Sequence, residues 1–293
     1  MAQDIKTADI AIIGTGPAGI SAAITAKIRN KEILLFGAEP VSSKVAKAHQ
    51  ILNYPGLPAV SGEELAQAYK RHLDELQIAV TKKRVHAVYA MGSYFAIQAG
   101  QEQYRADSVI LACGMTADKP FPGENEFLGR VSYCATCDAQ FFKGKTVAVI
   151  GYTKESVEEA QYLAEIVGKV LYFPMGKEAV LPGLSGNIEI CTEKPAEITG
   201  TMKVEQLKTD GKLYPVDGIF ILREAVFPGQ LVPGLKTEKN HAAVNLQMET
   251  NVAGLFACGD IAGTPYQYIK AAGQGNVAAL SAVSYLNRKK ETV

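Results

Sequence analysis

The chain of 293 residues has no tryptophan, only five cysteines and four histidines, and no excess of charge of either sign. Thirty basic residues balance thirty acidic ones, so no overall field draws the protein to nucleic acid or to an anionic membrane. No segment reaches the roughly 18 consecutive apolar residues of a membrane span. The first residues also lack the basic and apolar regions of a signal peptide. We therefore expect a cytoplasmic protein with no nucleic-acid and no membrane partner.

The few cysteines include one close pair, Cys134 and Cys137, followed directly by Asp138. An odd cysteine count in a cytoplasmic protein argues against a disulfide framework, whereas a Cys-x-x-Cys pair cycles readily between dithiol and disulfide. Asp138 is placed to give or take the proton that this cycling requires. The alternative is half of a zinc site, which needs two further ligands at metal spacing, and neither the other cysteines nor the histidines supply them. We predict a catalytic redox site of Cys134, Cys137 and Asp138, without a metal.

A dinucleotide-binding fingerprint stands near the N-terminus. The apolar run 10–13 is followed by Gly-Thr-Gly-Pro-Ala-Gly at positions 14–19 and then by a helix of small residues. In this order Gly14 permits the tight turn, Gly16 lets a pyrophosphate approach the backbone, and Gly19 lets the helix pack closely on the strand. The helix N-terminus then faces the phosphates. The alternative is a glycine-rich turn without a ligand, which the flanking strand and helix make the weaker interpretation.

Further candidates for cofactor contacts follow other predicted strands. A strand over 32–36 should end near a carboxylate that holds a ribose hydroxyl, and Glu39 is the nearest one. The run 109–112 ends on Cys113 and Gly114; the cysteine is either a third redox thiol or, as we favour, a small apolar filler. Asp260 at the end of a late strand can accept a hydrogen bond from a ligand hydroxyl. The candidate cofactor residues are Gly14, Gly16, Pro17, Ala18, Gly19, Glu39, Asn53, Gly114, Gly259, Asp260, Tyr268 and Ile269. These residues alone fit either FAD or NAD.

A second strand, turn and helix over 146–167 repeats the architecture of the first without its glycines. If Gly151 is the first position of the fingerprint, the second is Thr153 and the third is Ser156. A threonine Cβ would hold a pyrophosphate away from the backbone, and a serine loosens the contact between helix and strand. No paired arginines follow the strand over 169–174 to hold a 2′-phosphate. We predict the scaffold of a second nucleotide site whose binding chemistry has been lost.

Together these motifs resemble the low-molecular-weight thioredoxin reductases, a family of class II pyridine nucleotide-disulfide oxidoreductases, over nearly the whole chain. The matching stretches are the glycine loop at 14–19, Asn-Tyr-Pro-Gly at 53–56, Cys-Ala-Thr-Cys-Asp at 134–138 and Leu-Phe-Ala-Cys-Gly-Asp at 255–260. The resemblance implies FAD as cofactor, Asp260 at the ribityl chain, electron transfer from the flavin to the cysteine pair, and Asp138 as acid and base. It also implies thioredoxin as partner and a homodimer.

The resemblance further implies an α/β fold with two Rossmann-like three-layer domains. The flavin domain is discontinuous, spanning 1–115 and 244–293, and a redox-disulfide domain with a degenerate NADPH-type fold, residues 116–243, is inserted into it. In this family Cys137 faces the flavin and Cys134 attacks the partner's disulfide. Because one rigid arrangement cannot serve both contacts, we expect a domain rotation with hinges near 115–120 and 240–246.

Departures from the family concern the electron donor. Members that use NADPH have an intact glycine loop at 151–156 and paired arginines where this chain has Pro-Met-Gly at 174–176. A lysine-bearing loop over 41–48 also replaces the family's Gly-Gly-Gln-Leu. This pattern is similar to the ferredoxin-dependent flavin thioredoxin reductases, so we expect reduced ferredoxin as donor. The alternatives are an NADPH-dependent enzyme that holds phosphate with Lys154 and Lys177, and a flavin redox sensor without turnover.

Overall fold

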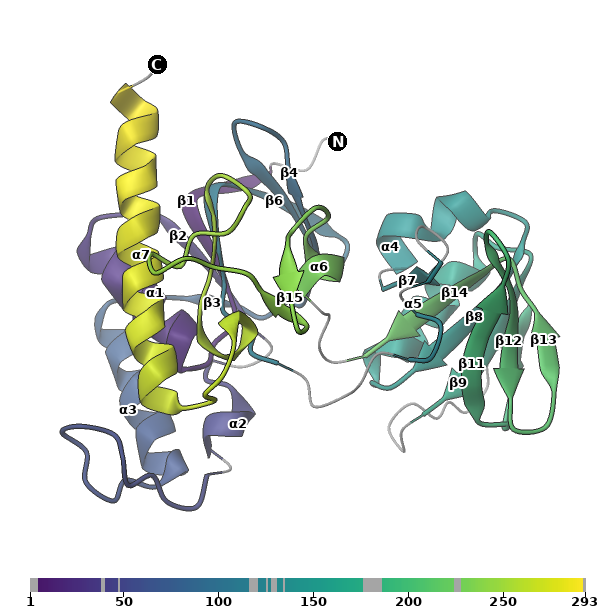
Figure 1. The fold of residues 1–293 in the computed structure, drawn as a ribbon, viewed down its shortest axis with the longest axis horizontal. Helices are drawn as coiled ribbons and strands as arrows, with labels where there is room; N and C mark the ends of the chain where they lie inside the picture. Colours follow the sequence, from purple (N-terminus) through teal and green to yellow (C-terminus); the bar gives the residue numbers. More distant parts are fainter. Residues whose placement is uncertain are drawn as a thin grey trace. The chain divides into compact units, whose positions relative to one another are not determined.

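The computed structural model describes residues 5–37, 40–46, 48–115, 121–124, 126–127, 131–133, 135–175, 186–223 and 228–291, and of Thr136 and Cys137 only the backbone. The chain divides into two compact units (Figure 1). Unit 1 comprises residues 1–115 and 227–293, and unit 2 comprises residues 116–226. The chain is therefore mixed α/β, with unit 2 inserted into unit 1.

Unit 1 is built on a parallel sheet with the order β3-β2-β1-β6-β17. Its strands are β1 (Lys6–Ile13), β2 (Ile33–Phe36), β3 (Val80–Thr81), β6 (Glu102–Leu111) and β17 (Leu255–Ala257). The central strands are continuous apolar runs because both faces of the sheet are covered. Their carboxyl ends meet at one edge, which is where ligands bind in sheets of this kind.

The strand β6 begins well before the apolar run 109–112 of the sequence analysis, because its two halves have different partners. Its first half pairs in antiparallel fashion with β5 (Phe95–Ala99), which forms a hairpin with β4 (Val85–Ala90). Its second half pairs in parallel with β17. One continuous strand thus connects the hairpin to the parallel sheet.

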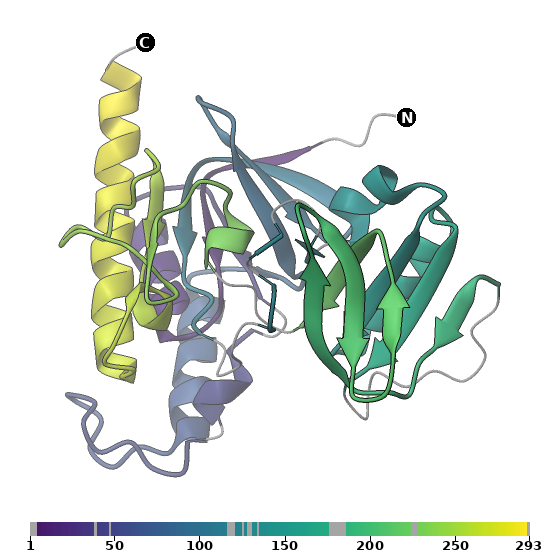
Figure 2. The ribbon, with the colours of Figure 1, turned by 45° about the vertical axis from the view of Figure 1, so that its right-hand side comes forward.

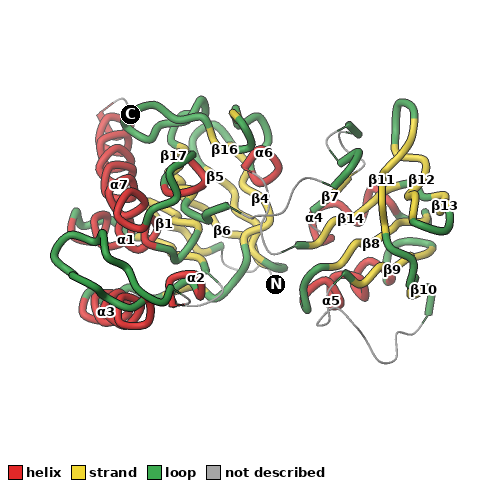
Figure 3. Tube along the Cα trace, turned by 60° about the horizontal axis from the view of Figure 1, so that its bottom comes forward, coloured by secondary structure: helices red, strands yellow, loops and turns green. Residues whose placement is uncertain are grey.

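Helices pack against the parallel sheet of unit 1 (Figure 3). They are α1 (Pro17–Ile28), α3 (Gly62–Glu75) and α7 (Tyr268–Glu291), with a short α2 (Ser43–Ala46) before α3. The helix α7 runs alongside α1 (Figure 1). A Cβ at Gly275 would lie 2.0 Å from the carbonyl oxygen of Ala18, so glycine permits this close helix contact. Among the described residues, no helix is both long and apolar enough to cross a membrane.

Unit 2 contains a five-stranded parallel sheet with the order β10-β9-β8-β14-β7. Its strands are β7 (Val131–Ser132), β8 (Thr146–Gly151), β9 (Lys169–Pro174), β10 (Ile188–Ile190) and β14 (Gly218–Leu222). Successive side chains of β8 enter different cores: Val147 and Val149 join one cluster, Ala148 and Ile150 the other.

Different layers cover the two faces of this sheet. The valine face packs against the short helix α4 (Ala135–Asp138), the 3-10 turn over Ala139–Phe142 and the helix α5 (Glu155–Ala164). The other face packs against a separate antiparallel sheet of β11 (Pro195–Gly200), β12 (Val204–Thr209) and β13 (Leu213–Pro215) (Figure 2). Unit 2 therefore has three layers, in agreement with the predicted fold class.

The second boundary between the units differs from the sequence prediction. Residues 227–243 were assigned to the inserted domain, but the structure groups them with unit 1. This segment forms α6 (Pro228–Leu231), β15 (Thr237–Glu238) and β16 (His241–Ala242). Its polar tip is a hairpin turn with Lys239 and Asn240 at φ 49° and 66°. Residues 240–246, where a hinge was predicted, therefore lie within unit 1 and not at its boundary with unit 2. Residues 224–227, where the chain returns to unit 1, lie outside the described part.

A buried ion pair lies in unit 2, between Glu124 and Arg223. The Glu124 carboxylate accepts hydrogen bonds from the backbone N–H of Phe121 and from the Arg223 guanidinium. The two residues lie shortly after the chain enters unit 2 and shortly before it leaves. Removing either partner would leave a buried charge without its counter-ion, so the pair fixes these two segments to each other.

Candidate functional site

The predicted cofactor residues of unit 1 meet at the carboxyl edge of its parallel sheet. Gly14 has φ 121° and its Cβ would lie 2.2 Å from the carbonyl oxygen of Ala112. Gly259 has φ 80° and its Cβ would lie 2.9 Å from the Cβ of Ala18. The glycine loop, the end of β6 before Gly114 and the Gly-Asp turn after β17 are therefore in direct contact.

Gly19 and Gly16 differ in whether the surrounding protein requires a glycine. A Cβ on Gly19 would lie 1.8 Å from the carbonyl oxygen of Gly14, so packing of α1 on its own turn excludes any side chain. Gly16 has φ −78° and ψ −178°, an extended conformation open to every residue, and its Cβ would meet no protein atom within 4 Å. The described protein atoms impose no need for glycine at this position, which agrees with the predicted close approach of a pyrophosphate.

The N-terminus of α1 is suited to phosphate. Its first turn carries no acidic side chain, and Gly16 at the N-cap offers no side chain that competes for the N–H groups. The exposed N–H groups and the helix dipole together favour an anion at this position. These residues fit the pyrophosphate of a dinucleotide such as FAD.

Asp260 lies in a polar environment in the turn after β17. Partial burial raises the pKa of its carboxyl group, while the charges of Lys270, Lys44 and His241 act in the opposite direction. The Lys270 ammonium donates to the carbonyl oxygens of Gly259, at 2.8 Å, and of Gly263, at 2.5 Å. Lys270 therefore holds the backbone of the turn on both sides of Asp260. Because these bonds go to carbonyl oxygens, they do not use the Asp260 carboxyl group, which can accept a hydrogen bond from a ligand hydroxyl.

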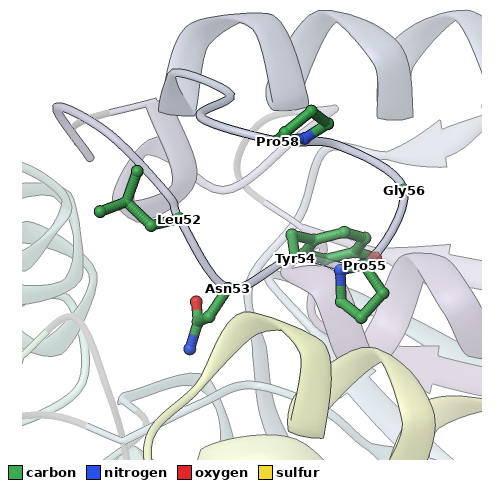
Figure 4. A pocket seen from close by; sticks show the side chains of 6 residues that line it. All are labelled: Leu52, Asn53, Tyr54, Pro55, Gly56 and Pro58. Atoms are coloured by element: carbon green, nitrogen blue, oxygen red, sulfur yellow. The ribbon is translucent and has the colours of Figure 1, made fainter.

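The remaining candidates in unit 1 link the surrounding loops. Asn53 donates through Nδ2 to Oε1 of Gln267 at 2.7 Å, and Figure 4 shows its amide pointing to the segment that leads into α7. An open pocket on this loop is lined by Leu52, Asn53, Tyr54, Pro55, Gly56 and Pro58. The Tyr268 hydroxyl donates to the carbonyl oxygen of Lys44 at 3.2 Å, and Ile269 is partly exposed beside it. Glu39 lies outside the described residues.

The redox motif of unit 2 is described in part. Cys134 lies outside the described residues, and only the backbone of Cys137 is described, within α4. Asp138 ends this helix, and the buried Ser132 on β7 donates from Oγ to its Oδ2 at 2.7 Å. Burial raises the pKa of Asp138, and the hydrogen bond from Ser132 opposes that shift. At the other end of α4, the N–H of Ala135 donates to Oε2 of Glu159 on α5 at 3.0 Å.

The turn after β8 is closed by its own side chains. Ser156 is fully buried, donates from Oγ to the carbonyl oxygen of Thr153 at 2.5 Å, and lies 2.8 Å from the hydroxyl of the buried Tyr172. A Cβ on Gly151 would lie 2.4 Å from this same Oγ. In unit 2 the serine side chain therefore lies between turn and helix, whereas in unit 1 the helix packs directly on the turn at Gly19.

The other cysteines lie where thiolates are disfavoured. Cys113 and Cys258 follow the neighbouring strands β6 and β17, and burial raises the pKa of Cys113 to about 11. Burial also raises the pKa of the fully buried Cys258, and raises that of Cys191 to about 11. Because the thiolate is the reactive form, these pKa values favour apolar filling over a third redox thiol.

Several residues near the sites escaped the sequence analysis. The charges of Lys44, His241 and Lys270, from three separate parts of the chain, lower the pKa of Asp260. No local sequence pattern predicts that these three side chains lie near the carboxyl group. Ser132 had a local signal, because it stands six residues before Asp138 in the cysteine motif itself. A polar residue at the end of a strand beside a catalytic acid is a candidate partner for that acid.

Comparison with known proteins agrees, over the full chain, with the family that the sequence motifs resemble. Residues 8–275 match the family model "Pyridine nucleotide-disulphide oxidoreductase". A thioredoxin reductase of Aquifex aeolicus is 35% identical, with 100% of this chain and 98% of the relative covered. A crystal structure of a ferredoxin-flavin thioredoxin reductase from Clostridium acetobutylicum is 47% identical with a TM-score of 0.88, covering 97% of this chain and 99% of the other. A second structure with the same description and organism is 50% identical, with a TM-score of 0.78 and coverage of 98% and 99%.

Proposed function

We infer the electron path of this chain from the family to which it belongs: it is one of the thioredoxin reductases of the pyridine nucleotide-disulphide oxidoreductase family, a flavoprotein disulfide oxidoreductase with FAD as cofactor. We propose that it takes electrons from reduced ferredoxin and passes them through the flavin to Cys134 and Cys137, which reduce the disulfide of thioredoxin. Two of the solved relatives are described as ferredoxin-flavin thioredoxin reductases, which supports this choice of donor.

The observation that carries the choice of donor is the closed turn after β8. Ser156 Oγ fills the space between turn and helix and is held by hydrogen bonds to Thr153 and Tyr172. A pyrophosphate also needs bare backbone at the second position of the loop, which is Gly16 in unit 1 and Thr153 in this turn. The filled turn therefore argues against NADPH as the donor.

The charges around this turn support the same choice. The first turn of α5 carries Glu155 and Glu158, whose carboxylates repel phosphate at the end of the helix where the dipole would attract it. Lys154 at the N-cap is one of the two cations that the NADPH alternative invokes. The second, Lys177, lies outside the described residues.

In the proposed mechanism FAD, when bound, exchanges electrons singly with ferredoxin and in pairs with a disulfide. The loop at 14–19 and Asp260 bind and orient the cofactor. The disulfide of Cys134 and Cys137 accepts two electrons and opens, and Asp138 supplies a proton to the pair. The Cys134 thiolate then attacks the thioredoxin disulfide, and Cys137 releases the reduced partner by closing the disulfide again.

Both contacts of the cysteine pair require movement of one unit against the other. We place the hinges at the two chain crossings given by the unit boundaries, after residue 115 and after residue 226. The proposal also includes a cytoplasmic location and a homodimer, whose size light scattering of the purified protein would measure.

The direct test is an anaerobic titration of the yellow protein followed by flavin absorbance. NADPH, NADH and chemically reduced ferredoxin are added in turn, and we expect only ferredoxin to bleach the flavin. Thioredoxin is then added, and free thiols are counted. A Cys134→Ser variant should still bleach with ferredoxin but reduce no thioredoxin.

Two results would overturn the proposal in different ways. Prompt bleaching by NADPH at micromolar concentration would make this chain a pyridine-nucleotide reductase with an unusual pocket. Bleaching by ferredoxin without any thiol formation on thioredoxin would favour the flavin redox sensor.

A further inference from the structure

We propose that Ser132 is a positioning residue for the proposed catalytic acid, holding one oxygen of Asp138 so that the other carries the exchangeable proton. The proposal rests on the proposed function of the cysteine pair. Its basis is the hydrogen bond from Ser132 Oγ to Asp138 Oδ2, 2.7 Å long, between a buried hydroxyl and a half-buried carboxyl group.

Ser132 is fixed by the sheet of unit 2. It lies on β7, where its register partner is Phe220 of β14, and only 3% of its surface is exposed. Asp138 is the last residue of α4, a helix of only four residues that could not hold a side chain rigidly by itself. The hydrogen bond thus connects the acid at the end of a short helix to a strand of the central sheet.

The other end of α4 is tied to a different element. The N–H of Ala135 donates to the Glu159 carboxylate on α5, at 3.0 Å. The four residues that contain Cys137 are therefore held at both ends, by α5 and by β7. The contact at Ala135 fixes the backbone, whereas the contact at Asp138 fixes a titrating group, so only the second can alter proton transfer.

The hydroxyl of Ser132 has two effects on Asp138. As a donor to Oδ2 it stabilises the ionised carboxylate, which opposes the rise in pKa that burial causes. Because Oδ2 already accepts the hydrogen bond from the Ser132 hydroxyl, the titrating proton of the Asp138 carboxyl group binds preferentially to Oδ1. Asp138 is therefore kept able to titrate and its proton is kept on one defined atom.

The proton balance of the exchange shows where this matters. When the Cys134 thiolate attacks the partner's disulfide, a new sulfur–sulfur bond forms, the old one breaks and a partner thiolate leaves. When Cys137 attacks Cys134, the second partner thiolate leaves. Two electrons and two protons have then entered the partner, and a proton passed from Asp138 Oδ1 to a leaving sulfur is replaced from solvent.

The test compares Ser132→Ala with the conservative Ser132→Thr, which keeps a hydroxyl on Cβ. The titration of Asp138 is followed in the flavin-loaded enzyme through its carboxyl stretch by infrared difference spectroscopy, with Asp138→Asn to assign the band. We expect the alanine variant to raise the pKa of Asp138 by about one unit, and the threonine variant to restore it.

Turnover with thioredoxin gives the second readout. Because the acid form is needed, the rate falls as pH rises through the pKa of Asp138, and in Ser132→Ala this fall should move upward by the same unit. At neutral pH kcat should drop by about tenfold, since a misaligned acid transfers its proton less efficiently. The flavin spectrum and flavin content should stay unchanged.

Two outcomes would contradict the inference. One is an unchanged titration of Asp138 in Ser132→Ala. The other is an equal loss of rate in the alanine and threonine variants with no movement of the pH profile, which would show a merely structural role. If the unmodified enzyme reduces no thioredoxin, the proposed function fails, while the infrared titration still decides whether Ser132 controls the acid.

Discussion

The two strand–turn–helix motifs of this protein share one architecture and differ at one packing position. In unit 1, Gly19 has no side chain, and α1 contacts the backbone of Gly14 directly. In unit 2, Ser156 takes the equivalent place and bonds to Thr153 and Tyr172. The turn of unit 1 therefore has no side chain between it and its helix, whereas the turn of unit 2 is hydrogen-bonded by the side chain of Ser156.

The two helix N-termini differ in charge as well. The first turn of α1 has no acidic residue and starts with a proline, whereas the first turn of α5 has Glu155 and Glu158. Acidic residues stabilise a helix N-terminus in the absence of a ligand and oppose the binding of phosphate. The comparison suggests that α5 has been stabilised as a structural element where α1 stays dependent on its ligand.

The largest effect is expected for Gly19→Ser, which gives unit 1 the serine of unit 2. Its Cβ would lie 1.8 Å from the carbonyl oxygen of Gly14 and 3.3 Å from the Cβ of Ala112. We expect a loss of about 3 kcal/mol or more of stability and loss of bound flavin. Thermal unfolding and the ratio of flavin to protein absorbance measure the two effects.

The matched control is Gly273→Ser, the same substitution at an exposed position of α7 where a Cβ would meet no protein atom. It should retain flavin and unfold near the temperature of the unmodified protein. Full flavin occupancy in Gly19→Ser would mean that the turn can open without cost, contrary to the packing seen here.

A finer test is Gly16→Thr, which copies Thr153 into unit 1. The extended backbone and the empty space around Gly16 accept a threonine, so the flavin-free protein should be as stable as before. FAD affinity should fall by about 100-fold, or ~2.7 kcal/mol, because the side chain occupies the approach of the pyrophosphate. Titration of flavin-free protein with FAD measures it, with Gly211→Thr in an exposed turn as control. Unchanged affinity would remove Gly16 from the site.

The smallest effect is expected in unit 2 for Ser156→Ala. It removes the Oγ that satisfies Thr153 and Tyr172 in a buried place, at a cost of about 1–3 kcal/mol. Denaturant unfolding followed by circular dichroism measures the loss, and Ser93→Ala in an exposed turn is the control. Flavin content should not change. A variant as stable as the control would show that the serine merely fills space.

Local patterns in the sequence were sufficient to identify the glycine loop at 14–19 and the missing glycines of the loop at 151–156. Both depend on residues within a few positions of one another, and a strand, a turn and a helix are decided at that range. The predicted structural role of Gly19 is confirmed by its contact with Gly14. The role of Gly16 toward the cofactor stays a prediction that its empty surroundings support.

Other sequence-based expectations needed the folded chain to correct them. Glycine stands at both 273 and 275 in α7, yet only Gly275 closely approaches a neighbour, the backbone of α1 at Ala18. The resemblance implied a hinge near 240–246, yet Lys239 and Asn240 form a hairpin turn of unit 1. In each case the same local composition fits two environments, and the choice depends on which distant element packs there.

The family, the glycine fingerprint, the Cys-x-x-Cys motif and the missing glycines of the second loop can all be recognised in the sequence, because each is a short motif with its own physical requirement. Tertiary structure alone decided that Lys270 and Lys44 act on Asp260, and that Ser132 holds Asp138. These contacts join side chains from separate strands and helices whose approach depends on how the sheets pack. Electrostatic and hydrogen-bond energies depend on those distances, so the environment of each acid appears only in the folded chain.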